Sequence, residues 1–126
     1  MKPEDIAVWE RYISKNPARF ESVDYDFRVG TGAEVDPNHP EEMQRDHTIL
    51  TQKKIDAVAY VGSFVYLIEV KPIADMKALG QILTYHKLYT VDNPQELAVR
   101  KMIVCGSIER ELEPIFAENN IFVEVA

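Results

Sequence analysis

Two short runs of β-branched and aromatic residues lie close together near the middle of the chain, at Ile55–Val61 and Phe64–Lys71. Only Gly62-Ser63 separates them, and such a two-residue connection is typical of a β-hairpin. A helix is predicted next, capped by Asp75 and continuing to about Val91. Its apolar positions recur at intervals of three and four residues and predict a buried face made of Met76, Leu79, Ile82, Leu83 and His86.

The residues before the hairpin predict one helix and one strand. The helix runs from Pro3 to about Lys15, with a buried stripe formed by Ile6, Trp9 and Ile13. Phe20–Val29 alternates cleanly from Ser22 onward, which is the pattern of a half-buried strand. Its polar side carries Asp24 and Asp26, which we expect to face solvent.

The segment between that strand and the hairpin is rich in residues that interrupt regular structure. Residues 30–46 contain two glycines and two prolines and are interpreted as a loop. A loop of this length in a small domain is often functional or mobile. Thr48–Thr51 is expected to extend the Asp56 strand backwards.

The remainder of the chain completes an α/β pattern. The predicted elements are a buried strand at Val99–Cys105, a helix from Ile108 to about Glu118 that Pro114 bends, and a last strand at Ile121–Val125. The strand–helix–strand order after Lys71 implies a right-handed crossover and therefore a parallel pair of strands. At 126 residues the chain is long enough for one domain, so we predict a single α/β domain over residues 1–126, with helices flanking a mixed sheet.

The predicted hairpin brings ionisable residues together. The turn fixes the facing pairs as Tyr60 with Val65, Val58 with Leu67 and Asp56 with Glu69. Lys71 follows Glu69 by two residues and shares its face. Two carboxylates directly opposite each other destabilise a hairpin unless something cationic lies between them. The two carboxylates and the main-chain carbonyl of Val70 are hard oxygen ligands suited to Mg²⁺ or Mn²⁺, and a neighbouring lysine can position water or stabilise charge on a phosphate.

These residues resemble a known signature. Asp56, twelve intervening residues and Glu69-Val70-Lys71 resemble the D…(D/E)-x-K motif of the PD-(D/E)xK nuclease superfamily. Gln81-Ile82-Leu83-Thr84-Tyr85 resembles the Q-x-x-x-Y element of its RecB-like and lambda-exonuclease-like branches. The E-x-K element alone is common on solvated strands, but the combination is considerably more specific.

The resemblance implies a restriction-endonuclease-like αβββαβ core and metal-dependent hydrolysis of DNA. In that interpretation Asp56, Glu69 and Val70 hold Mg²⁺ or Mn²⁺, and Lys71 positions or activates water. Gln81 and Tyr85 orient the substrate; the alternative is that they only pack around the edge of their helix. Superfamily members often carry a glutamate on the first helix that points at the metal. Glu10 is the candidate here, and an ordinary solvated acid at the border of the stripe is an equally good interpretation.

Charge is the main objection to DNA as a partner, because the chain has a formal net charge of −7 and phosphate contacts favour basic surfaces. Residues 44–101 contain eight Lys or Arg and six Asp or Glu, a net charge of +2, whereas the rest contains six and fifteen, a net charge of −9. The segment that carries the motif is therefore the basic part. Lys54 and Lys87 are its candidate phosphate contacts, although Lys54 also suits a charged strand end that discourages edge pairing.

Composition restricts the remaining possibilities. Apolar residues make up 46% of the chain, yet no apolar run is long enough for a membrane span and the N-terminus lacks the apolar core of a signal peptide. With one cysteine, Cys105, which is expected in the core, these features favour an intracellular, cytoplasmic protein. The sequence does not decide between a monomer and a homodimer. It also leaves open a second function, a non-catalytic module on the same fold that binds nucleic acid or a protein.

Overall fold

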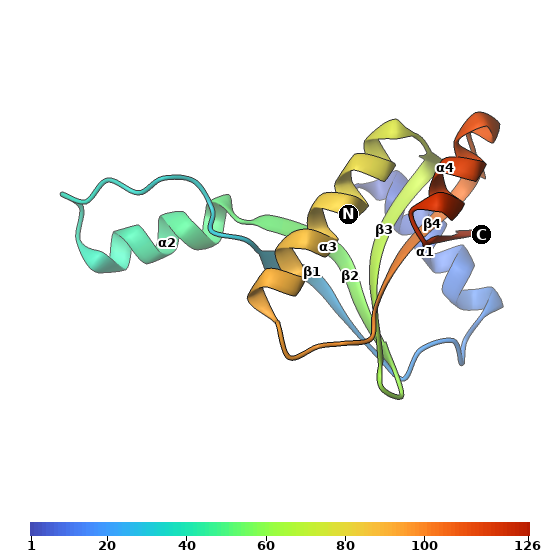
Figure 1. Ribbon diagram of the computed structural model, residues 1–126, viewed down its shortest axis with the longest axis horizontal. Helices are drawn as coiled ribbons and strands as arrows, with labels where there is room; N and C mark the ends of the chain where they lie inside the picture. The colour runs from blue at the N-terminus through green and yellow to red at the C-terminus, as the bar shows by residue number, and fades with distance from the viewer.

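Five strands form one mixed sheet in the order β1-β2-β3-β4-β5 in the computed structural model, which describes residues 1–126 (Figure 1). The strands are β1 (Ser22–Val29), β2 (Lys53–Val61), β3 (Phe64–Ala74), β4 (Val99–Ile108) and β5 (Ile121–Val125). The helices are α1 (Pro3–Lys15), α2 (Glu41–Thr51), α3 (Met76–Asp92), a 3₁₀ turn η1 (Arg110–Leu112) and α4 (Glu113–Glu118). β1, β2 and β3 are antiparallel neighbours, and β4 is parallel to both β3 and β5. The prediction of an α/β fold with a mixed sheet, and of a parallel pair after Lys71, is confirmed.

Helices cover both faces of the sheet, and β3 contributes to both layers. On one side Val65 and Leu67 pack with α3 and with Phe116 of α4. On the other side Ile68 and Val70 pack against α1 (Figure 1). Strands that are buried on both faces are expected to be almost continuously apolar, and β3 and β4 are. Glu69 in the middle of β3 is the exception.

The buried stripe of α1 is rotated from the predicted one. It consists of Asp5, Val8, Trp9 and Tyr12. Ile6 remains 42% exposed and Ile13 is half-buried. Both sets have helical spacing and share Trp9, so periodicity could not choose between them. The aromatic contacts of Trp9 with Phe20 and Tyr25 accompany the observed orientation.

Residues 30–52 form an arm that extends away from the sheet (Figure 1). The predicted loop ends before Glu41 and not at residue 46, and the prediction of a strand at Thr48–Thr51 is wrong, because α2 occupies Glu41–Thr51. This helix buries no residue, and its large apolar side chains, Met43, Ile49 and Leu50, stay exposed. At its base Gln52 Nε2 donates to the Gly30 carbonyl at 2.7 Å, and the Ala33 amide donates to Thr51 Oγ1 at 2.8 Å.

Two other helices differ from expectation in detail. In α3 the buried residues are Ala78, Ile82, Tyr85 and Tyr89, whereas Met76 is 72% exposed. Pro114 occupies the first turn of α4 and does not bend it, because a proline is compatible with a helix start, where its missing N–H is not needed. None of the helices combines the length and the apolar character needed to cross a membrane.

Candidate functional site

The candidate site lies where β2 and β3 separate. Their pairing follows the predicted register, with Tyr60 opposite Val65 and Val58 opposite Leu67, and it ends at Ala57 and Ile68. Asp56 and Glu69 come directly after this end, so they are not a ladder pair. Instead Asp56 Oδ2 accepts a hydrogen bond from the Val70 amide at 2.9 Å. The Asp56 carboxylate is therefore fixed to the main chain of β3, next to Glu69.

A local break in β1 and β2 gives Asp56 this orientation. Tyr25 contacts Trp9 on the α1 side of the sheet, and Phe27, two residues later, contacts Tyr89 on the α3 side. Regular alternation would put both on the same side. The switch occurs at Asp26, which has a φ of 51° and lies where β1 would face Asp56, and this pair is missing from an otherwise continuous ladder. The irregular backbone turns Asp56 out of the apolar layers and towards the edge of β3.

Glu69 is the most deeply buried acid in the cluster, at 3% exposure. Its Oε1 lies 3.7 Å from Lys71 Nζ, and its Oε2 is buried with no hydrogen-bond partner. Burial, reinforced by the charge of Asp56 and opposed by that of Lys71, raises the pKa of Glu69 to about 8. Burial also raises the pKa of Asp56, although the Val70 amide lowers it in part. Without a further cation, the two carboxyl groups resist being ionised together.

α3 contributes Gln81 and Tyr85 to the same region. Asp75 caps the helix by accepting from the Ala78 amide at 2.9 Å, as predicted. Tyr85 is 8% exposed, and burial together with the charges of Glu69 and Asp56 raises its pKa to about 12. Gln81 Oε1 is buried and has no partner. The residues that the sequence proposed on β2, β3 and α3, namely Asp56, Glu69, Lys71, Gln81 and Tyr85, are therefore brought together.

On the first helix the acid whose charge reaches Asp56 and Glu69 is Asp5, which the sequence reasoning missed and whose Oδ2 also accepts from the Lys2 amide at 3.1 Å. Asp5 is 6% exposed, and its charge is a minor cause of the raised pKa values of both Asp56 and Glu69. Glu10 is exposed and lies about 140° around the helix from Asp5. The available signal was the spacing of Asp5 to Val8 and Tyr12, which places it on the stripe that is actually buried.

The two lysines predicted to contact phosphate, Lys54 and Lys87, both lie on the surface. Lys54 is exposed and lies opposite Arg28 of β1, beyond the point where β3 stops pairing with β2. Lys87 is exposed on α3. The lysines that line a cavity with Gln81 and Tyr85 are Lys53 and Lys77.

The donors fit a hard cation that keeps part of its ligand set from outside the protein. Asp56 and Glu69 offer carboxylate oxygens, Glu69 Oε2 has no other partner, and the main chain of Val70 is adjacent. No group of three or more His, Cys, Asp or Glu side chains gathers to hold a metal ion. A site with two side-chain carboxylates suits Mg²⁺, which usually retains several waters, and does not suit a closed structural metal.

Asp56→Asn is expected to raise the melting temperature of the protein in EDTA at pH 8. The amide oxygen can still accept from the Val70 N–H, while the charge that raises the pKa of Glu69 is gone. A gain of about 1 kcal/mol corresponds to a few degrees in a domain of this size. Asp56→Ala is the control, because it leaves the Val70 N–H without its acceptor and should cost about 1–3 kcal/mol. A lower melting temperature for Asp56→Asn would contradict charge repulsion at the site.

The comparisons with known proteins identify no relative. No family model matches the chain, and neither the curated proteins nor the solved structures gave a significant match.

Proposed function

We propose that this protein is a metal-dependent nuclease that hydrolyses phosphodiester bonds in DNA, built on the restriction-endonuclease-like core of the PD-(D/E)xK superfamily. The observation that carries the proposal is the convergence of Asp56, Glu69 and Lys71 with Gln81 and Tyr85 at the point where β2 and β3 separate. The two acids are difficult to ionise at the same time, and a lysine lies beside one of them. Such an arrangement is typical of a site in which a bound cation balances the negative charge.

Each side chain has a role that its position supports. Asp56 and Glu69, with the carbonyl of Val70, would hold Mg²⁺ or Mn²⁺, which supplies positive charge to the attacked phosphate. Lys71 donates N–H groups that orient the attacking water and stabilise charge on the phosphoryl oxygens. Gln81 offers a free acceptor, and Tyr85 a hydroxyl that stays protonated at neutral pH, so both can orient a substrate strand.

The test is cleavage of fluorescently labelled DNA by purified protein, with single-stranded, linear duplex and circular substrates in Mg²⁺, Mn²⁺ or EDTA. We expect degradation with either metal and none with EDTA. The Asp56→Asn/Glu69→Gln double variant, purified identically, controls for a contaminating nuclease. Equal cleavage by the double variant would assign the activity to a contaminant and contradict the proposal.

A non-catalytic module on the same fold is the second candidate. It is favoured by the formal net charge of −7 and by an arm whose α2 is acidic in its first turn and exposes Met43, Ile49 and Leu50. Such a module would bind its partner equally well after Lys71→Ala and would cleave nothing. The cleavage assay therefore distinguishes the two candidates.

A further inference from the structure

A cavity of about 400 Å³ lies beside the candidate site, along the side of α3 that carries Gln81 and Tyr85. Lys53 reaches it from the start of β2, and α3 supplies the remaining lining residues, Lys77, Gly80, Gln81, Thr84 and Tyr85. Only one of the six residues is hydrophobic. The chemistry of this lining is that of a polar, cationic ligand site.

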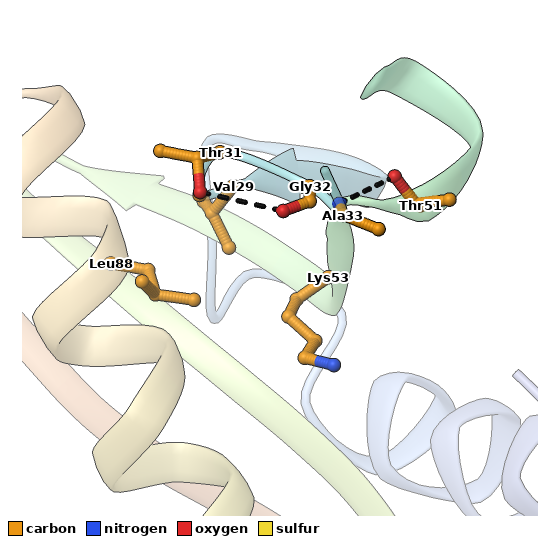
Figure 2. Close-up of a pocket in the computed structure, with 8 residues that line it drawn as sticks. Val29, Thr31, Gly32, Ala33, Thr51, Lys53 and Leu88 are labelled. Carbon is orange, nitrogen blue, oxygen red and sulfur yellow. Dashed lines mark hydrogen bonds between the residues drawn. The ribbon is translucent and has the colours of Figure 1, made fainter. Parts of the chain in front are cut away.

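The two lysines bring positive charge to the cavity that no ion pair compensates. Lys53 and Lys77 are both exposed and neither forms an ion pair, although acids outnumber basic residues by 21 to 14. Figure 2 shows Lys53 at the neighbouring cavity, at the base of the arm, with its ammonium pointing away from Gly32 and Ala33 and bonded to none of the residues drawn. Two free cations on one cavity attract an anion.

Gly80 is a second sign of a ligand. A glycine inside a helix lowers stability relative to alanine, so it needs a reason. A Cβ at this position would meet no atom within 4 Å, so packing within the protein does not require the glycine. Its absent side chain leaves space on the cavity side of α3, where a ligand can approach the backbone closely.

Gln81 gives an independent third sign. Its Oε1 is buried and accepts no hydrogen bond within the protein. A buried acceptor without a donor is costly, and such groups call for an explanation. A ligand that combines an anion with a hydrogen-bond donor would satisfy the two lysines and Gln81 together, and a nucleotide unit of a nucleic-acid strand has both.

We propose that this cavity binds one phosphate of the substrate strand, next to the phosphodiester that the candidate active site attacks. Lys53 and Lys77 contact the phosphate, Gly80 allows the strand to approach α3, and Gln81 accepts from the attached nucleoside. The inference rests on the proposed nuclease function, and it replaces Lys54 and Lys87 as the main phosphate contacts.

Binding of a fluorescent single-stranded oligonucleotide, measured by anisotropy in EDTA and again in Ca²⁺, tests the two lysines. The Lys53→Ala/Lys77→Ala variant is expected to bind at least about tenfold more weakly, with a shallower salt dependence, since each lost contact lowers the log–log slope by about 0.7 on a single strand. Lys15→Ala/Arg100→Ala is the matched control; it removes the same charge at two exposed positions that do not line the cavity and should bind within twofold of the wild type. Equal losses in the two variants, or no salt-dependent binding by the wild type in either condition, overturn the proposal.

Replacing one phosphate of the oligonucleotide at a time with a neutral linkage shows which phosphate the cavity binds. Oligonucleotides with one methylphosphonate, moved stepwise along the strand, should include one position that weakens wild-type binding and has no further effect on the lysine variant. The same sensitivity in both proteins at every position overturns the assignment. Inorganic phosphate distinguishes a simple anion site, because competition at millimolar concentration with no preferred linkage would show that the strand itself is not recognised.

Gly80→Ala separates the role of the glycine from the stability of the helix. Alanine favours a helix, so the melting temperature should be unchanged or higher, whereas oligonucleotide binding should fall several-fold. Unaltered binding would remove Gly80 from the site.

All these binding measurements are independent of cleavage. Lysine-dependent binding without Mg²⁺-dependent cleavage would refute the nuclease proposal alone. Cleavage together with unaltered binding by the lysine variant would refute the phosphate site alone.

Discussion

Replacing Lys71 with alanine is expected to lower the rate of Mg²⁺-dependent DNA cleavage about 10²–10⁴-fold while the protein stays folded. This range is typical for the loss of one group that transfers protons or stabilises charge in the transition state. Lys71 is half-buried at the end of the apolar part of β3, with its ammonium 3.7 Å from Glu69 Oε1. It is therefore the lysine whose charge acts directly on Glu69.

The lysine also acts on Glu69, and the experiment must separate the two effects. Lys71 lowers the pKa of Glu69, so its removal raises that pKa further and weakens metal binding at neutral pH. Rates should therefore be measured at saturating Mg²⁺ and at both pH 7 and pH 9. Lys71→Met, which keeps the aliphatic stem, is the matched variant. Recovery of the wild-type rate by either variant at pH 9 would show that the lysine serves only metal binding.

Glu69→Gln is expected to give the largest change in stability, an increase of about 2–4 kcal/mol for the metal-free protein at pH 8. The pKa of Glu69 rises from 4.5 to about 8 on folding, so the folded state binds more protons than the unfolded state between these pH values. Stability therefore falls as pH rises through this window, by up to 1.4 kcal/mol per pH unit. Glutamine cannot ionise, so the variant does not lose stability as the pH rises through this window.

Thermal denaturation in EDTA between pH 4 and pH 9 measures the effect. The wild type should lose stability steadily from about pH 5 to pH 8. The stability of Glu69→Gln should change little over the same range. Added Mg²⁺ should restore the wild type at pH 8 by mass action and leave the variant almost unchanged. Parallel pH profiles for the two proteins would show that the Glu69 carboxyl is not strained.

Much of the fold could be predicted from the sequence because the pattern of β2, β3 and α3 is strong. Gly62-Ser63 set the register of the hairpin, and that register brought Asp56 close to Glu69 although they do not pair. The α/β class and the parallel arrangement of β3 and β4 followed from the order of the elements.

The errors arose where local patterns carry too little information. Two overlapping stripes on α1 share Trp9, and only tertiary packing selects the one that contains Asp5. The exact end of the β2–β3 ladder was likewise not predictable, because it is set by the break at Asp26 and not by alternation. α2 has no buried residue, so its formation depends on helix-favouring residues that the preceding glycines and prolines obscured.

The exposed position of α2 has a consequence for how this chain can vary. Eleven residues without a buried face are below the length at which isolated helices are stable, so the arm should open locally, with rapid amide exchange, while β3 and β4 stay protected. The register of β2 is set by its pairing with β1 and β3, not by α2. Insertions, deletions or a substituted module between residues 33 and 50 should therefore leave the spacing of Asp56 and Glu69 unchanged. The arm is the part of the molecule where new binding partners could be acquired without altering the chemistry of the site.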